Sequence, residues 1–183
     1  MPLLALYTCP VLTCAPGDEA YAAFAGLDAA IAAELAGRPP EGLVRVVADL
    51  PPPGRWPAHV APAGGTPKPT LSVWRSLEAA FAYSYGPGLH RRALRRRREW
   101  CLRPAGPVYV LWYVAEADAA VHDAAIARLD RLGAAGPGPE AFDFRHPFDP
   151  GGRPVDPRPL AALRGDAAGA GPAPLPLRES GMP

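Results

Sequence analysis

The chain has 183 residues, including 26 prolines and 19 glycines, and its formal net charge is +1 at pH 7. A net charge so close to zero argues against a general nucleic-acid-binding protein. There is no apolar run of about 18 residues that would predict a membrane span, and the first residues lack the basic and apolar segments of a signal peptide. We therefore expect a cytoplasmic protein that binds neither nucleic acid nor membrane.

The first half of the chain predicts two strands separated by a helix. Residues 2–9 form an apolar segment typical of a strand, and Asp18 and Glu19 stand where acids favour the start of a helix. Residues 43–50 are rich enough in valine and leucine to predict a second strand. The Pro- and Gly-rich residues 51–69 predict a loop insert, of the kind that often forms a lid or stays disordered.

The second half continues the alternation of strands and helices. Its patterns predict a strand at 70–74, a helix at 77–85 capped by Ser76, a helix at 89–101, a strand at 107–115 and a helix at 117–133. Residues 151–183 contain mainly Pro, Gly, Ala and Arg without periodicity. Such a segment buries too little apolar surface to offset the entropy of ordering, so we expect a disordered tail.

This order of elements is the split βαβ pattern βαββαβ, with further helices added. It predicts an α+β domain over residues 1–150, built on a ferredoxin-like antiparallel sheet. Helices would cover one face of this sheet. The other face would need a partner, commonly a second copy of the chain, so we expect a homodimer that closes into a dimeric α+β barrel.

Two polar residues interrupt the apolar stripe of the helix at 89–101. His90 and Arg97 fall inside the stripe, two turns apart. In a structural interpretation, Arg97 pairs with Glu78 or Glu99 and His90 caps the start of the helix. In a functional one, both line a cavity, where His90 acts as acid, base or metal ligand and Arg97 holds an anionic oxygen. The other arginines predict a solvated face, with a nucleic-acid patch as the alternative: Arg91, Arg92, Arg95, Arg96 and Arg98.

Four blocks of the sequence resemble the successive blocks of one bacterial family. They read LSVWRSLEAAFAY, LHRRALRRRREW, PVYVLWYV and RLDRLGAAGPGPEAFDFRHPF, and they extend from Leu71 to Phe148. The family is a domain of unknown function, placed in the superfamily of dimeric α+β barrels that includes antibiotic biosynthesis monooxygenases. Matching positions include His90, Arg97, Trp100, Trp112 and Arg145.

The resemblance implies a small-molecule enzyme but no particular reaction. Relatives in the superfamily include monooxygenases of antibiotic biosynthesis, haem-degrading and haem-binding enzymes, and polyketide cyclases. In several haem-binding members the iron ligand is a histidine on the helix before the last strand, the helix that carries His90 here. Haem bound through His90 is therefore one alternative, and the absence of any cofactor is the other.

We accordingly expect a tailoring enzyme of specialised metabolism that carries out a monooxygenase-like oxidative step on a small organic substrate in a barrel pocket. The expected catalytic residues are His90, Arg97 and Tyr85, the last two orienting an oxygen. The expected substrate-binding residues are Trp74, Trp100 and Trp112 as an apolar wall, together with Arg145. A cofactor-free cyclase or isomerase on the same fold is the first alternative. A non-enzymatic protein that binds a small ligand or acts in stress is the second.

Overall fold

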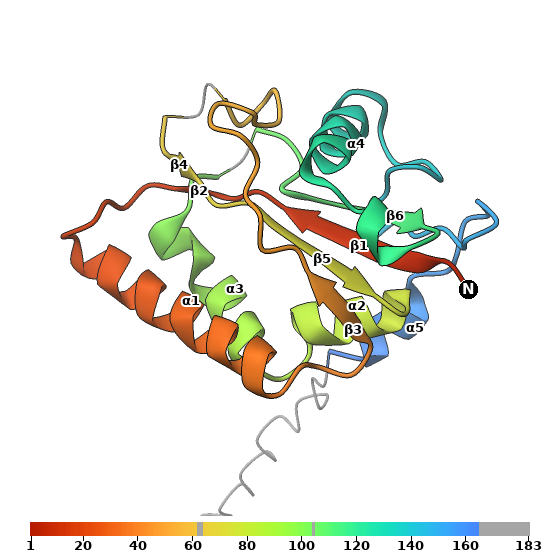
Figure 1. Cartoon of the computed structure of the whole chain (residues 1–183), viewed down its shortest axis with the longest axis horizontal. Helices are drawn as coiled ribbons and strands as arrows, with labels where there is room; N and C mark the ends of the chain where they lie inside the picture. The colour runs from red at the N-terminus through yellow and green to blue at the C-terminus, as the bar shows by residue number, and fades with distance from the viewer. Residues whose placement is uncertain (62–63, 104, 165–183) are drawn as a thin grey trace, which may run out of the picture.

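The computed structural model describes residues 1–61, 64–103 and 105–164. At its centre lies a four-stranded antiparallel sheet (Figure 1) in the order β3-β5-β1-β6. These strands are β1 (Leu3–Thr8), β3 (Leu43–Val46), β5 (Thr70–Trp74) and β6 (Tyr109–Val114). A second, two-stranded sheet pairs β2 (Val11–Leu12) with β4 (Thr66–Pro67). Strands and helices share one domain, so the α+β class expected from the order of elements is confirmed.

The central strand β1 is buried on both faces, which means that both faces of the sheet are covered. Leu4 and Leu6 point to one side and join one apolar cluster. Ala5 and Tyr7 point to the other side and join a second cluster. Because successive side chains of a strand alternate between the two faces, a strand that is apolar at every position indicates burial on both.

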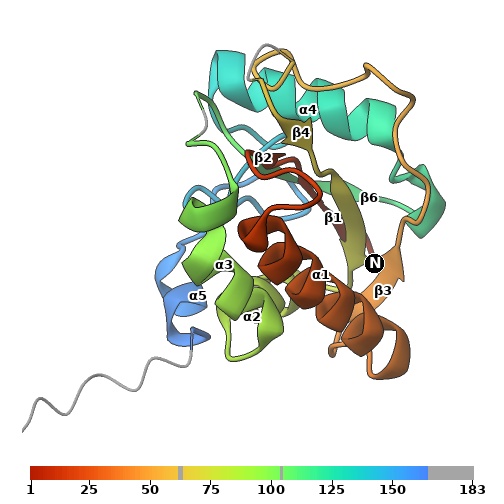
Figure 2. The ribbon, with the colours of Figure 1, turned by 90° about the vertical axis from the view of Figure 1, so that its left-hand side faces the viewer.

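Three helices lie on the face of Leu4 and Leu6. They are α1 (Glu19–Gly37), α2 (Leu77–Tyr85) and α3 (Leu89–Trp100). Helix α2 packs directly on the sheet and buries Leu77, Ala80 and Phe81 beside Trp74. Helix α1 lies along α3 instead (Figure 2), and none of its own residues is fully buried. The side chains between α1 and α3 form a third cluster around Trp100.

The opposite face of the sheet is covered by this chain itself. Helix α4 (His122–Ala135), which follows the short 3-10 helix η1 (Ala117–Ala119), lies across that face (Figure 1). Its Ala125, Ile126 and Leu129 are buried against the side chains of Tyr7 and Trp112. We expected this face to be covered by a second copy of the chain; in the monomer it is covered by α4, because this helix folds back over β6, the strand that precedes it.

The Pro- and Gly-rich insert at 51–69 has a definite structure where it is described. Pro57 is fully buried, and Val60 joins the cluster under α4. The backbone N–H of Ala58 donates to the Asp130 carboxylate at 2.7 Å, which fixes the insert to α4. The expectation of a lid or disordered loop is therefore wrong for the described part, since prolines can pack and pre-order a segment that has few backbone donors.

The predicted disordered tail has structure at its beginning. Residues 151–164 include helix α5 (Arg158–Ala162), whose Leu160 is buried in the cluster around Trp74 and Phe81. A five-residue helix with one buried residue is too short to give a periodic signal, so only the tertiary contact could reveal this helix. The rest of the predicted tail, residues 165–183, lies outside the described residues.

Among the described residues, α1 is the helix that by length and composition could cross a membrane, with a mean hydropathy of 1.2. One helix of this kind is weak evidence, because alanine-rich helices of other proteins meet the same test. In this fold α1 contacts α3 through Tyr21, Phe24 and Leu27, and it carries Asp28 in an ion pair with Lys68 at 2.9 Å.

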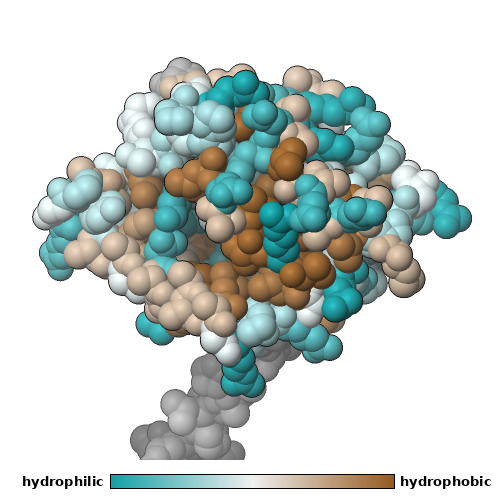
Figure 3. Space-filling view, in the orientation of Figure 1, coloured by the Kyte–Doolittle hydropathy of each residue, from teal (hydrophilic) through white to brown (hydrophobic). Residues whose placement is uncertain are grey.

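The free edge strand of the sheet exposes apolar side chains. Val44, Val46 and Leu50 are exposed on and after β3, and Figure 3 shows brown apolar side chains gathered over the sheet between α1 and α4. An uncovered edge of this kind is where another chain could pair. The homodimer stays a prediction, which light scattering in solution would test.

Candidate functional site

His90, in the first turn of α3, is held in one orientation and one tautomer. Its Nδ1 lies 3.1 Å from the backbone oxygen of Ser84, the buried residue at the end of α2. A carbonyl oxygen only accepts hydrogen bonds, so Nδ1 carries the proton and donates it. In the neutral ring the lone pair is therefore on Nε2. No described residue hydrogen-bonds to Nε2, and that atom is not among the fully buried ones without a partner.

The surroundings of His90 favour the neutral imidazole. Burial lowers the pKa of His90 below its ordinary value of 6.5, and the hydrogen bond to Ser84 opposes this only in part. The ring stacks on Tyr83 with 4.8 Å between centroids. Tyr83 in turn stacks on Trp74 at 5.0 Å, whose indole nitrogen donates to Ser72 at 2.8 Å. His90 thus presents an accessible, unprotonated nitrogen near neutral pH, which is what a general base requires.

Tyr83, which lies between His90 and Trp74 in this stack, is kept protonated. Burial, together with the nearby carboxylates of Glu34 and Asp28 on α1, raises the pKa of Tyr83 to about 12. Its hydroxyl is therefore a proton donor and not a base at any pH near neutrality. Tyr83 faces the C-terminal half of α1, because both acids that act on it belong to that helix.

An open cleft of about 430 Å³ lies between that half of α1 and the start of α3. Its lining residues are Glu34, Gly88, Leu89, Arg91, Arg92 and Arg95. His90 stands in the sequence between two of them, Leu89 and Arg91. Glu34 connects the two features, since it lines the cleft and also acts on Tyr83.

Arg97 does not face inward with His90. Its side chain is exposed, and its guanidinium donates to the backbone oxygen of Leu94 on its own helix at 2.8 Å. The buried side of this part of α3 is set by Trp100 and Ala93, which pack toward α1. The apolar stripe predicted from the sequence therefore agrees with the structure near both ends of the helix. Helix α1 packs on a different part of the α3 surface and leaves Arg97 exposed.

Tyr85 lies apart from His90, in an aromatic cluster beyond α2. Its ring is 4.9 Å from that of Phe81 and 5.6 Å from that of Phe144, between centroids. Burial, together with the electrostatic effect of the nearby Tyr85 hydroxyl, raises the pKa of the neighbouring Tyr109. The Tyr109 hydroxyl therefore stays protonated near neutral pH, and both tyrosines belong to this packed cluster. The three expected catalytic residues, His90, Arg97 and Tyr85, are therefore in three different places.

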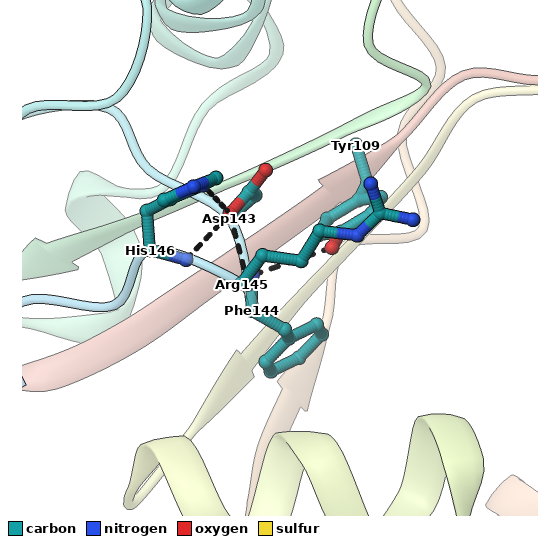
Figure 4. Close-up of polar contacts among 5 residues, drawn as sticks. All are labelled: Tyr109, Asp143, Phe144, Arg145 and His146. Atoms are coloured by element: carbon teal, nitrogen blue, oxygen red, sulfur yellow. Dashed lines mark hydrogen bonds and ion pairs between the residues drawn. The ribbon is translucent and has the colours of Figure 1, made fainter. Parts of the chain in front are cut away.

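Arg145 lies on a turn whose backbone is fixed by its neighbours (Figure 4). The Asp143 carboxylate accepts hydrogen bonds from the N–H of Arg145 at 2.9 Å, and from the N–H and ring of His146 at 2.8 and 3.0 Å. The N–H of Phe144 donates to the Tyr109 hydroxyl at 3.3 Å. The Arg145 side chain is exposed and has no ion pair in the described part of the chain. It is thus available to an anion, but on a different surface from His90.

The three tryptophans that we expected to form one wall are buried in three separate clusters. Trp74 lies on the α2 face of the sheet, Trp112 on the α4 face, and Trp100 between α1 and α3. The register on β1 separates Trp74 from Trp112: Trp74 lies beside Leu4 and Trp112 beside Ala5, and these adjacent residues of β1 point to opposite faces of the sheet. These indoles support the fold, and only Trp74 contacts the His90 stack.

His122, the first residue of α4, is a buried polar residue that the sequence analysis did not single out. It packs edge-on against Tyr7, with 5.8 Å between ring centroids, and its Nε2 donates to the Asp49 backbone oxygen at 2.7 Å. Its Nδ1 is buried without a partner among the described residues. The signal was present in the sequence: His122 precedes the core residue Leu129 by seven positions, two helical turns, and so shares its face.

The residues around His90 do not fit a haem. An axial histidine needs the flat macrocycle directly against its nitrogen, with apolar walls on both sides. Here the nearby cleft is lined mainly by charged side chains and not by His90, so no apolar slot for a macrocycle adjoins its nitrogen. Among the described residues there is also no group of three His, Cys, Asp or Glu side chains that could hold a metal ion.

The lowered pKa of His90 predicts how stability depends on pH. The folded state disfavours the charged ring, so it binds fewer protons than the unfolded state. The stability that comes from the neutral His90 ring is complete above pH 6.5, the ordinary pKa of histidine. It is lost as the pH falls toward the pKa of His90 in the folded state. We expect the free energy of unfolding to decrease as the pH is lowered through this window, and to decrease less in His90→Gln. Urea unfolding between about pH 8 and pH 5 would measure this, and equal pH dependence in the two proteins would contradict it.

The family model of a domain of unknown function (DUF3291) matches residues 3–157. No curated protein matches the chain, and no solved structure does. The matched range includes the sheet, all of α1 to α4, the cleft and the turn of Arg145.

Proposed function

The chain belongs to the family described as a domain of unknown function (DUF3291), and from its site we propose that it is a cofactor-free enzyme that moves protons on a small organic molecule. The reaction class is that of an isomerase or cyclase, with His90 as the general base. One observation carries the proposal: the Nδ1 of His90 donates to Ser84, which leaves on Nε2 a lone pair that no described residue uses, on an atom that is not among the fully buried ones without a partner.

The chemistry follows from this geometry. Nε2 accepts a proton from an acidic C–H or O–H of a molecule that lies against the start of α3. The resulting imidazolium keeps its Nδ1–H bond to the Ser84 oxygen, and this charge-assisted hydrogen bond stabilises it. The lowered pKa of His90 then favours return of the proton to another atom of the same molecule. Tyr83, protonated and stacked on the ring, holds the imidazole plane.

The order of the strands supports the ferredoxin-like arrangement, and with it the superfamily that the resemblance implies. Taken along the chain, the large strands are β1, β3, β5 and β6, and the sheet places them as β3-β5-β1-β6. We propose this topology with α4 as an added cover on the second face. In such a molecule the reaction takes place at the helix side of one chain, and not inside a barrel shared by two.

Proton transfer can be tested without knowing the natural substrate. A panel of keto acids and sugar phosphates, compounds with acidic C–H bonds, is incubated with the protein in deuterated water, and mass spectrometry follows deuterium uptake. We expect uptake by at least one class of compound. His90→Gln should slow it by about 10²-fold or more, the usual contribution of a general base.

His146→Gln is the matched control, because it removes an exposed imidazole that pairs with Asp143 away from the cleft. This variant should exchange at the wild-type rate. Equal rates in wild type and His90→Gln, or no uptake by any compound, would contradict the proposal. Oxygen consumption during turnover would contradict it as well, and would favour the monooxygenase-like reaction that the resemblance implies.

A further inference from the structure

The cleft beside His90 carries an excess of positive charge on one wall. Arg91, Arg92 and Arg95 come from the first two turns of α3, while Glu34 of α1 is the acid on the opposite side. Arg92 and Arg95 are one turn apart, so their side chains leave the helix on the same side. Three arginines facing one carboxylate leave a net positive cleft.

Two of these arginines have no protein partner in the part of the chain that is described. Arg92 and Arg95 form no ion pair there, although both line the cleft. Their neighbours on α3 differ: Arg96 binds the Glu99 carboxylate at 2.8 Å, and Arg97 donates to its own helix. An arginine without a protein partner, fixed on a helix at the wall of a cleft, is suited to bind the oxygens of a phosphate or carboxylate.

The start of α3 adds to this potential. Helix α3 begins after Gly88, with no side-chain hydrogen bond at its cap and no acidic residue in its first turn. The positive end of the helix dipole is therefore not neutralised by the cap or first turn of α3, and Gly88 itself lines the cleft. This contribution is secondary, because the arginines and the cleft would attract an anion in any case.

We propose that this cleft binds the oxyanion of a small molecule, a phosphate or a carboxylate, through Arg92 and Arg95. Glu34 on the other wall repels a second anionic group and accepts a hydrogen bond from a hydroxyl or an ammonium. The ligand class is thus a small molecule with one oxyanion at one end and a neutral or basic polar group at the other. This assignment rests on the proposed function only in taking that molecule to be the substrate of His90.

The distribution of the arginines favours a small ligand over a nucleic acid. A strand of RNA or DNA would need a continuous basic track with aromatic platforms. Here only one side of α3 lines the cleft. Arg96 lies outside this lining, stacks over Trp100 at 4.9 Å and is paired with Glu99. Arg97 and Arg98 lie in the last turn of the helix and are not part of the cleft lining.

Calorimetric titration at constant ionic strength tests the assignment, with glycerol phosphate and glycerate as the two probes, because each carries one oxyanion and a neutral hydroxyl. We expect saturable binding of at least one probe, and the stronger one identifies the phosphate or the carboxylate as the preferred group. Arg92→Gln and Arg95→Gln should each weaken binding by about tenfold or more, the usual loss for a charge-assisted hydrogen bond. Arg98→Gln, which removes the same charge from the same helix outside the cleft, should change affinity less than about twofold.

Three results would overturn the assignment. The first is no binding of either probe at millimolar concentration. The second is an equal loss in Arg95→Gln and Arg98→Gln, which would mean unspecific attraction. The third is tighter binding of a single-stranded oligonucleotide than of both probes, weakened equally by all three substitutions.

The same titration separates this inference from the proposed function. His90→Gln should keep the affinity for the probe, because His90 does not line the cleft. Binding of the probe without any effect of His90→Gln on deuterium exchange would remove the proposed function alone. A His90-dependent exchange without probe binding would remove the present inference alone.

Discussion

Replacing Phe142 with alanine is expected to lower the free energy of unfolding by about 3–5 kcal/mol, the range for a large aromatic side chain in a core. Phe142 is fully buried, at 0% exposure, on the α2 face of the sheet. Its backbone is also paired with β6: the N–H of Leu111 donates to the Phe142 oxygen at 2.8 Å, and the reverse bond is 3.0 Å. The residue thus anchors the segment that carries Arg145.

The measurement is urea unfolding followed by tryptophan fluorescence, with Val155→Ala as the control. Val155 follows in the same C-terminal segment but is 39% exposed, so its truncation should change stability by only about 0.5 kcal/mol or less. If Phe142→Ala lost no more than this control, the segment would not be part of the core, and the turn at Asp143 would have no fixed position over Tyr109.

Replacing Leu129 with alanine is expected to cost about 2–5 kcal/mol, the range for a buried leucine. Leu129 is fully buried where α4 packs on the sheet, at 0% exposure, in the cluster that includes Tyr7 and Trp112. Its loss would leave a cavity between helix and sheet, because Ala125 on the preceding turn is too short to fill it. The prediction tests whether α4 covers the face that a barrel dimer would otherwise use.

Val121→Ala at the start of α4 is the matched control, since Val121 is 49% exposed and should contribute about 0.5 kcal/mol or less. The result must also be independent of protein concentration. A stability that rose with concentration would indicate that a second copy supplies part of this core. That outcome would favour the dimeric barrel over a face closed by α4.

The positions of most elements follow from the local pattern of the sequence. The strand predicted at 70–74 and the helix predicted at 77–85 have these bounds in the structure. The start of the helix is set by its cap. The Ser76 side chain accepts a hydrogen bond from the N–H of Ala79 at 3.2 Å, an interaction between residues only three positions apart. The position of His90 at the start of a helix after the glycine-rich turn likewise depends only on neighbouring residues in the sequence.

The function of each side chain depended on contacts that the local pattern does not contain. His90 and Arg97 are equivalent on a helical wheel, yet one is partly buried beside Ser84 and the other is exposed. Which part of α3 is covered depends on the crossing of α1, some 60 residues earlier in the chain. The same holds for Tyr85, the last residue of α2, whose ring packs against Phe144 from a distant part of the chain.

The sequence by itself therefore determined the α+β class, the positions of the main strands and helices and the candidate base, because propensity, periodicity and capping act between residues only a few positions apart. The tertiary structure alone decided that α4 closes the second face of the sheet, that α1 rests on α3, and that the cleft collects Arg92 and Arg95 but not Arg97. These outcomes come from packing between distant segments, where total burial selects among arrangements that the local pattern leaves equal.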